Sequence, residues 1–140
     1  MTSESVRPIS VLREGKGPQV LLVRGGASPI ATWRGLEGLT ERWTLAFVYR
    51  RGFPPSPPPE AGYQDFEVDS DDLVGLLDGR SHVVAHSYGA VAAVLAAIRQ
   101  PDRVRSLTLI EPALFMPMQD LEVARFQRLG DLVLAQGAED

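Results

Sequence analysis

Residues 81–90, SHVVAHSYGA, constrain the fold of this chain more than any other part of its sequence. An apolar run typical of a β-strand meets a helical pattern there, with only Ser87 between the two. A strand that becomes a helix over one residue holds that residue in a strained backbone conformation. The side chains two positions before and after it must then be very small. Ala85 and Gly89 meet this requirement, so we expect a sharp strand-to-helix turn at Ser87.

A turn of this kind is a way to mount a nucleophilic serine. It exposes the hydroxyl group at the start of the helix that we expect over residues 88–99. The unpaired N–H groups and the positive dipole end of such a helix suit a developing oxyanion. The pattern therefore predicts acyl transfer at Ser87. The chain has two histidines, His82 and His86, and none follows Ser87.

Composition excludes several classes of function. The chain has 140 residues, of which 44% are apolar and 23% charged, with a net charge of −4, as expected for one globular domain. It lacks the basic excess that nucleic acids require. It has no cysteine, and two histidines supply at most half of a zinc shell, so we expect no metal and no other cofactor.

No segment predicts a membrane location. The longest aliphatic run, residues 90–98, is far shorter than the roughly 20 residues that span a bilayer. The first ten residues lack the basic start and the apolar core of a signal peptide. We therefore expect a cytoplasmic protein that does not bind membranes.

Apolar β-type segments alternate with helical patterns along the chain, which is typical of βαβ units. The sequence predicts strands over residues 9–13, 19–23, 44–49, 82–85 and 104–110, and helices over residues 32–43, 66–77, 88–100 and 120–136. The predicted fold class is α/β, a three-layer α/β/α sandwich with a mostly parallel sheet.

Three segments, in this order, resemble the N-terminal half of an α/β-hydrolase. VLLVRGG at residues 20–26 is similar to the strand and His-Gly turn of that family, with Arg24 in place of the histidine. FVYRRGF at residues 47–53, followed by Ser56, is similar to its Asp-x-Arg-Gly-x-Gly-x-Ser segment, with Tyr49 in place of the aspartate. AHSYG at residues 85–89 matches the Gly-x-Ser-x-Gly elbow with one small residue exchanged for another.

The resemblance covers roughly residues 8–115 and implies a serine hydrolase of the esterase type. Its nucleophile would be Ser87, and the backbone N–H groups of Gly26 and Tyr88 would form the oxyanion hole. The substrate would be a small-molecule ester, thioester or similar acyl compound. In the family the catalytic histidine follows the last strand, so we expect it to be missing from these 140 residues. Residues 1–115 would be the N-terminal part of a truncated core, and residues 116–140 the start of a lid or of a helix covering the sheet edge.

Glu111 is the candidate for the acid of the triad. It ends the predicted strand 104–110, which should lie about 4.8 Å from the elbow strand. Haloalkane dehalogenases, among other α/β-hydrolases, place the acid at this strand end. The alternative is that Glu111 only ends the strand and accepts hydrogen bonds in the loop.

Neither histidine is a good candidate for the base. His82 precedes Ser87 by five residues, which places it about 16 Å away along the strand. We expect His86 to point away from the nucleophile and to pack beneath the turn.

Three further patterns have ordinary structural explanations. Asp65, Asp69, Asp71, Asp72 and Asp78 are interpreted as a solvated helix face and its caps rather than a metal site. The proline-rich residues 53–59 are interpreted as a stiff loop, with docking to an aromatic groove as the alternative. The glycines at 25–26 lack the spacing of a dinucleotide-binding loop.

Two hypotheses remain for the function. The chain is part of a Ser-His-acid hydrolase, which would have little activity without its base, or it is a catalytically inactive fragment or interaction module. In either case strand 104–110 should form an open, apolar edge of the sheet. We expect this edge to self-associate, to pair with a complementing chain, or to be covered by residues 120–136.

Overall fold

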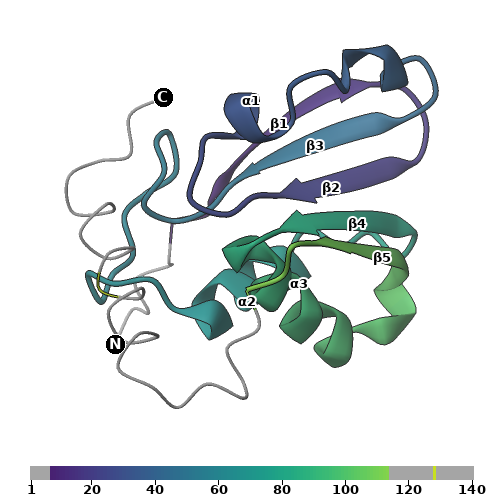
Figure 1. Cartoon of the computed structure of the whole chain (residues 1–140). Coiled ribbons are helices and arrows are strands. Elements are labelled where there is room, and N and C mark those ends of the chain that lie inside the picture. Colours follow the sequence, from purple (N-terminus) through teal and green to yellow (C-terminus); the bar gives the residue numbers. More distant parts are fainter. Residues whose placement is uncertain (1–6, 114–127, 129–140) are drawn as a thin grey trace.

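The computed structural model describes residues 7–113 and residue 128, and its centre is a five-stranded sheet (Figure 1). The strands are β1 (Ser10–Gly15), β2 (Gln19–Val23), β3 (Thr44–Tyr49), β4 (Ser81–His86) and β5 (Val104–Ile110). Their order in the sheet is β1-β3-β2-β4-β5. Only β1 is antiparallel to its neighbour, so β2 to β5 all end at the same edge of the sheet.

The strands agree closely with the sequence-based expectations. The predicted bounds of β2, β3 and β5 are confirmed, and β4 is one residue longer at each end than expected. β1 runs over Ser10–Gly15 rather than residues 9–13. The continuous apolar runs of β2 and β4 reflect their central position, where both faces of the sheet are covered.

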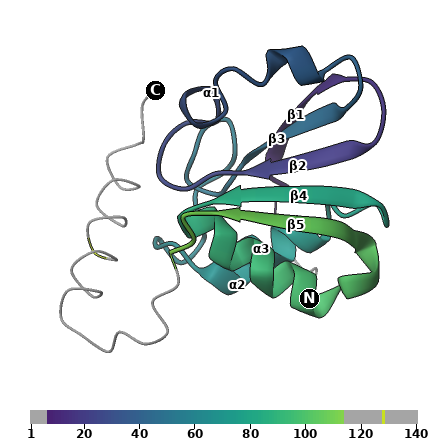
Figure 2. The same ribbon diagram turned by 45° about the vertical axis from the view of Figure 1, so that its right-hand side comes forward.

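Helices α2 (Phe66–Val74) and α3 (Tyr88–Arg99) cover one face of the sheet (Figure 2). The core on this side joins alternate residues of the central strands to the two helices. Leu21 and Val23 of β2, for example, pack with Leu73 of α2 and Ala93 of α3. α2 ends at Val74 rather than at residue 77, and Gly75 caps it.

The opposite face carries much less helix than expected. The predicted helix over residues 32–43 is wrong, because this segment forms only the end of α1 (Pro29–Thr32) and the 3-10 helix η1 (Glu37–Leu39). Gly35, with φ of +93°, lies between them in a left-handed conformation that an α-helix does not contain. Trp33, Leu22 and Leu45 form a smaller core on this side.

β5 is the last strand of the sheet within the described residues, and it pairs on one side with β4. A short 3-10 helix, η2 (Pro101–Arg103), leads into it from α3. Leu109 and Ile110 are 36% and 41% exposed. The lid or edge-covering helix expected over residues 116–140 falls outside the described part of the chain, apart from the single residue 128. No helix within the described ranges has the length and apolarity needed to cross a membrane.

We predict that Leu21→Ala lowers the free energy of unfolding by about 2–5 kcal/mol, because Leu21 is fully buried in the larger core. The matched control is Leu12→Ala on β1, where the leucine is 47% exposed and the loss should stay below about 1 kcal/mol. Urea denaturation measures both values. Equal losses in the two variants would contradict the described core.

Candidate active site

Ser87 forms the complete link between β4 and α3, as the sequence predicts. Its backbone has φ of 54° and ψ of −120°, which confirms the expected strained conformation. Its amide donates to the carbonyl oxygen of Ile110 at 3.0 Å, and its own carbonyl accepts from the amide of Ala113 at 3.2 Å. The end of β5 therefore fixes the strained turn from one side. No hydrogen bond from the Ser87 side chain caps α3.

The residues two positions before and after Ser87, Ala85 and Gly89, are tightly enclosed. Ala85 is fully buried. A Cβ atom at Gly89 would lie 2.3 Å from the carbonyl oxygen of Arg24 and 2.9 Å from Cγ1 of Val23. The end of β2 packs directly against the first turn of α3, so Gly89 must be small for this contact as well as for the turn.

The loop after β2 lies against Ser87. A Cβ atom at Gly25 would be 2.9 Å from Cβ and 3.3 Å from Oγ of Ser87. Gly26 follows in open space, with no atom within 4 Å of the place that its Cβ would occupy. The loop thus brings Gly25 against Ser87 with Gly26 directly after it, and Tyr88 begins α3 directly after Ser87. The start of α3 carries no acidic residue that would oppose a negative charge there.

Arg50, the residue directly after β3, connects the parts of this region, and sequence reasoning does not identify it. It is 2% exposed, and its guanidinium donates to four groups, one of which is Oε1 of Gln64 at 3.3 Å. Nε binds the carbonyl oxygen of Arg24 at 3.1 Å, Nη2 binds that of Gly25 at 2.8 Å, and Nη1 binds Oδ2 of Asp69 at 3.1 Å. The one signal for it in the sequence is the pair Arg50-Arg51, which directly follows the apolar strand 44–49.

Aromatic rings cover the guanidinium groups. The Arg50 guanidinium carbon lies 4.3 Å from the ring centre of Tyr88 and 4.9 Å from that of Phe53. Arg24, which stands where the resembling family has histidine, is also buried; it donates to the carbonyl oxygen of Ala27 and lies 3.7 Å from the Phe53 ring. Cation–π contacts of this kind are worth more when they are desolvated.

The aspartates of α2 are only partly the solvated face that the sequence suggested. Asp65 caps the helix as expected, by accepting from the amides of Glu67 and Val68. That interpretation is wrong for Asp69, which is 5% exposed and paired with Arg50, and for Asp72, which pairs with Arg51. Burial raises the pKa of Asp69, and the attraction of Arg50 offsets this in part. Burial and the charge of Asp69 likewise raise the pKa of the Tyr88 hydroxyl, which keeps it protonated.

Glu111 lies where the sequence places it, directly after β5, with φ of 45° and an exposed side chain. It follows Ile110, whose carbonyl oxygen accepts from Ser87. The topology therefore brings Glu111 to the same edge of the sheet as Ser87, and its role as the acid stays a prediction.

The two histidines lie on β4. Nδ1 of His82 is 2.6 Å from Oγ of Ser106, and its ring packs edge-on against Trp43. His86 shares the face of β4 that carries His82 and Val84, because strand side chains alternate. Val84 packs with the smaller core, on the side of the sheet opposite α3.

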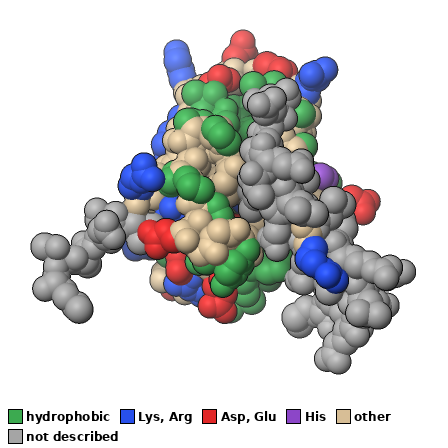
Figure 3. Space-filling model, turned by 90° about the vertical axis from the view of Figure 1, so that its left-hand side faces the viewer, with side chains coloured by type: hydrophobic (Ala, Val, Ile, Leu, Met, Phe, Trp, Pro, Cys, Tyr) green, Lys and Arg blue, Asp and Glu red, His purple; other side chains and the backbone are tan. Residues whose placement is uncertain are grey.

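Figure 3 looks onto the side of the molecule at which the parallel strands end. Hydrophobic and uncharged side chains occupy the middle of the described surface there, and Lys and Arg side chains project mainly at its outline.

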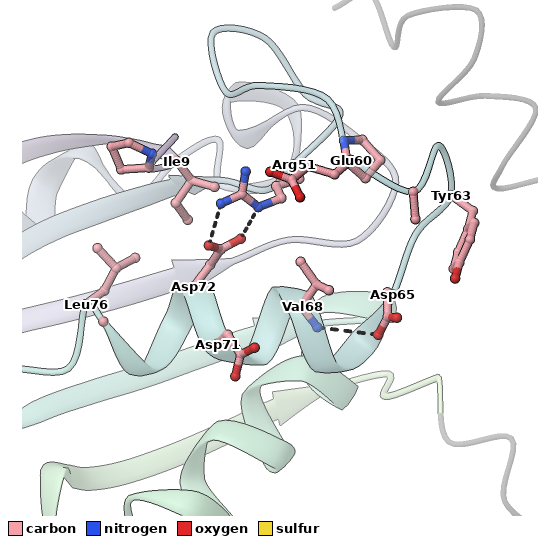
Figure 4. Close-up of a pocket in the computed structure, with 13 residues that line it drawn as sticks. Ile9, Arg51, Glu60, Tyr63, Asp65, Val68, Asp71, Asp72 and Leu76 are labelled. Atoms are coloured by element: carbon pink, nitrogen blue, oxygen red, sulfur yellow. Dashed lines mark hydrogen bonds and ion pairs between the residues drawn. The ribbon is translucent and has the colours of Figure 1, made fainter. Parts of the chain in front are cut away.

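A separate pocket of about 580 Å³ lies between the start of β1, the loop at residues 59–63 and α2 (Figure 4). Asp72 and Arg51 form an ion pair across it, with Nε and Oδ2 2.9 Å apart. Asp65, also in its wall, is engaged as the helix cap. Ser87, Gly26 and Tyr88 do not line this pocket, so it is not the predicted site.

Comparison with known proteins supports the resemblance. Residues 20–139 match the model of the alpha/beta hydrolase family. The chain is 36% identical over 108 residues to 2-(acetamidomethylene)succinate hydrolase from Mesorhizobium japonicum, covering 74% of this chain and 38% of that protein. It is 29% identical over 103 residues to a pimeloyl-[acyl-carrier protein] methyl ester esterase from Aeromonas salmonicida, covering 73% of this chain and 41% of that one.

Solved structures give the same result. E-2-(acetamidomethylene)succinate hydrolase matches with a TM-score of 0.64 at 34% identity, covering 71% of this chain and 38% of that protein. An N-formylmaleamic acid deformylase from Pseudomonas putida matches with a TM-score of 0.61 at 30% identity, covering 73% and 42%. The chain therefore spans about two fifths of the length of the relatives that it matches.

We expect Gly89→Ala to lower the free energy of unfolding by about 1–3 kcal/mol, because its Cβ atom would overlap the Arg24 carbonyl oxygen. Gly26→Ala is the matched control at the same end of the sheet, where open space predicts a change within about 0.5 kcal/mol. Chemical denaturation compares the two variants. A stable Gly89→Ala variant would show that β2 and α3 do not approach as closely as described.

Asp69→Asn tests the buried ion pair. Removing its charge leaves the Arg50 guanidinium buried without a counter-ion, so we predict a loss of about 3 kcal/mol in the free energy of unfolding. Asp71→Asn is the matched control, two residues further along α2. It removes the ion pair between Asp71 and Arg99, whose side chains are 62% and 48% exposed, and should cost less than about 1 kcal/mol. Similar losses in both variants would mean that the Arg50 pair does not support the fold.

Proposed function

The chain belongs to the alpha/beta hydrolase family, and from this we propose that it contributes the nucleophile and the oxyanion hole of a serine hydrolase. The observation that carries the proposal is the strained turn at Ser87, with Gly25 packed against its Cβ and Oγ atoms. A positive φ at a non-glycine residue is costly, and here hydrogen bonds with Ile110 and Ala113, at the end of β5 and just after it, hold the Ser87 backbone in place. Strain of this kind is concentrated at functional sites.

In the proposed reaction the Ser87 hydroxyl oxygen attacks the carbonyl carbon of an acyl substrate. The serine proton leaves to a general base, and the carbonyl oxygen becomes an oxyanion. The backbone N–H groups of Gly26 and Tyr88 then stabilise this charge, and the dipole of α3 adds to the effect. When the tetrahedral intermediate collapses, the leaving group takes up a proton and the acyl group remains on Ser87 until water releases it.

The proposal assigns the general base to a group outside these 140 residues. The only histidines of the chain are His82 and His86. His82 is bound to Ser106 near the opposite end of β4, and His86 shares its face of the strand. Glu111 is the proposed acid that would orient such a base, because it follows the strand that is bonded to the Ser87 turn. Without the base we expect the chain to be weakly active at most.

We place the polypeptide that carries this base beside β5. Within the described residues β5 has a strand on one side only, and its last residues, Leu109 and Ile110, are exposed apolar side chains. An edge of this kind is a template for a further strand. A strand added there would also lie next to Glu111 and to the turn at Ser87.

The relatives suggest the class of substrate. Two are named as an acetamidomethylene-succinate hydrolase and a formylmaleamic acid deformylase, and another as a methyl ester esterase. These names describe hydrolysis of carboxylic acid derivatives, one of which is attached to an acyl-carrier protein. We therefore propose an ester, thioester or similar acyl compound as the substrate. The hydrolase relatives do not favour the alternative of an inactive interaction module.

The test is covalent labelling of the folded chain with a fluorophosphonate, with intact mass as the readout. The expected result is a single adduct on Ser87 that forms slowly and is accelerated by excess imidazole, which supplies a base in solution. Ser87→Ala should abolish the adduct. Ser106→Ala removes an exposed serine of β5 and should leave labelling unchanged.

Two results would contradict the proposal. One is a chain that is folded by circular dichroism and forms no adduct with imidazole present. The other is an adduct that persists in Ser87→Ala, because the reactive group would then be a different residue.

A further inference from the structure

Both donors of the proposed oxyanion hole are backbone groups, the N–H groups of Gly26 and Tyr88. Arg50 contacts Tyr88 directly and contacts Gly25, the residue before Gly26. The Arg50 guanidinium binds the carbonyl oxygens of Arg24 and Gly25 and lies against the Tyr88 ring. This one buried side chain, directly after β3, therefore contacts the peptide that carries the Gly26 N–H and the ring of Tyr88.

Peptide geometry makes the contact with Gly25 decisive. The Gly25 carbonyl and the Gly26 N–H belong to the same planar peptide group, and in a trans peptide these two bonds point in opposite directions. Arg50 holds the carbonyl oxygen at 2.8 Å. The direction of the Gly26 N–H is therefore fixed away from Arg50. A free glycine pair would otherwise rotate easily, since glycine restricts its backbone less than any other residue.

We propose that Arg50 is a positioning residue that orients the Gly26 N–H for the oxyanion, an inference that rests on the function proposed above. Arg50 does not touch the reacting atoms. It acts through the Gly25–Gly26 peptide, and its positive charge on the carbonyl side also polarises the N–H bond and strengthens it as a donor.

Arg50 is itself held in place from three directions. Asp69 of α2 binds Nη1 at 3.1 Å, and Gln64 binds the same nitrogen at 3.3 Å. The rings of Phe53 and Tyr88 lie beside the guanidinium carbon. A side chain with 2% exposure and this many partners is held firmly in place, so it can impose an orientation on a loop that contains two glycines.

Arg51 provides a matched control. It is the next residue, it is 4% exposed, and it also forms an ion pair with an aspartate of α2, Asp72 (Figure 4). Its other bond runs to the carbonyl oxygen of Arg7, away from the loop after β2. Replacing Arg51 therefore removes an equivalent buried ion pair without changing the contacts of Gly25.

The experiment compares Arg50→Met with Arg51→Met in the full chain. Three quantities are measured: the rate of imidazole-assisted fluorophosphonate labelling of Ser87, the ¹H–¹⁵N resonance of the Gly26 amide, and the urea midpoint. We expect Arg50→Met to slow labelling by about tenfold to a hundredfold, approaching the loss caused by deleting one oxyanion donor. Its Gly26 resonance should shift and broaden. Arg51→Met should lower the urea midpoint to a similar extent and leave the labelling rate within about twofold.

Arg50→Lys separates charge from geometry and serves where the methionine variant fails to fold. Lysine keeps a positive charge opposite Asp69 but lacks the fork that reaches two carbonyl oxygens together. We expect it to restore the urea midpoint and not the labelling rate. Recovery of both by lysine would overturn the positioning role.

The remaining outcomes are also decisive. Equal slowing in Arg50→Met and Arg51→Met, or an unchanged Gly26 resonance in Arg50→Met, would overturn the inference. If the wild-type chain is not labelled at all, the proposed function fails, and the Gly26 resonance alone then decides whether Arg50 sets the orientation of this peptide.

Discussion

The buried guanidinium of Arg50 is the constraint on which the arrangement of the site depends. A charge with 2% exposure must have partners, and Arg50 finds them on the loop after β2 and on α2. It also lies against the ring of Tyr88 on α3. Segments that are distant in the sequence are thereby held around one group. The cost of leaving such a charge without a partner is much larger than the gain from any single surface contact.

The parallel sheet explains why this group lies next to Ser87. β2, β3, β4 and β5 end at one edge, so the residues that follow them meet there. β3 contributes Arg50, β2 contributes the loop at Gly25, and β4 contributes the turn at Ser87. β5 contributes the carbonyl oxygen of Ile110, which binds the Ser87 amide. The strained turn survives because β5 and the loop after β2 fix it from two sides.

The sequence alone predicts the elements whose signals are local. Continuous apolar runs identify the strands, and the small residues around Ser87 identify the turn, since both effects arise within a few residues. The sequence does not predict the break at Gly35, because apolar spacing suggests a helix whether or not the chain remains helical. The pairing of Arg50 with Asp69 could not be predicted, because it joins residues 19 positions apart and depends on how α2 packs on the sheet. A charged helix face looks the same in a sequence whether it is solvated or buried against an arginine.

The most direct test of the account is a crystal structure of the chain after fluorophosphonate has reacted with Ser87. The phosphonyl oxygen imitates the oxyanion, and the account predicts that it lies about 3 Å from the backbone nitrogens of both Gly26 and Tyr88. The Gly25 carbonyl should remain bound to Arg50 in that adduct. An oxygen that points to solvent, or a Gly25–Gly26 peptide turned away from Ser87, would contradict the account.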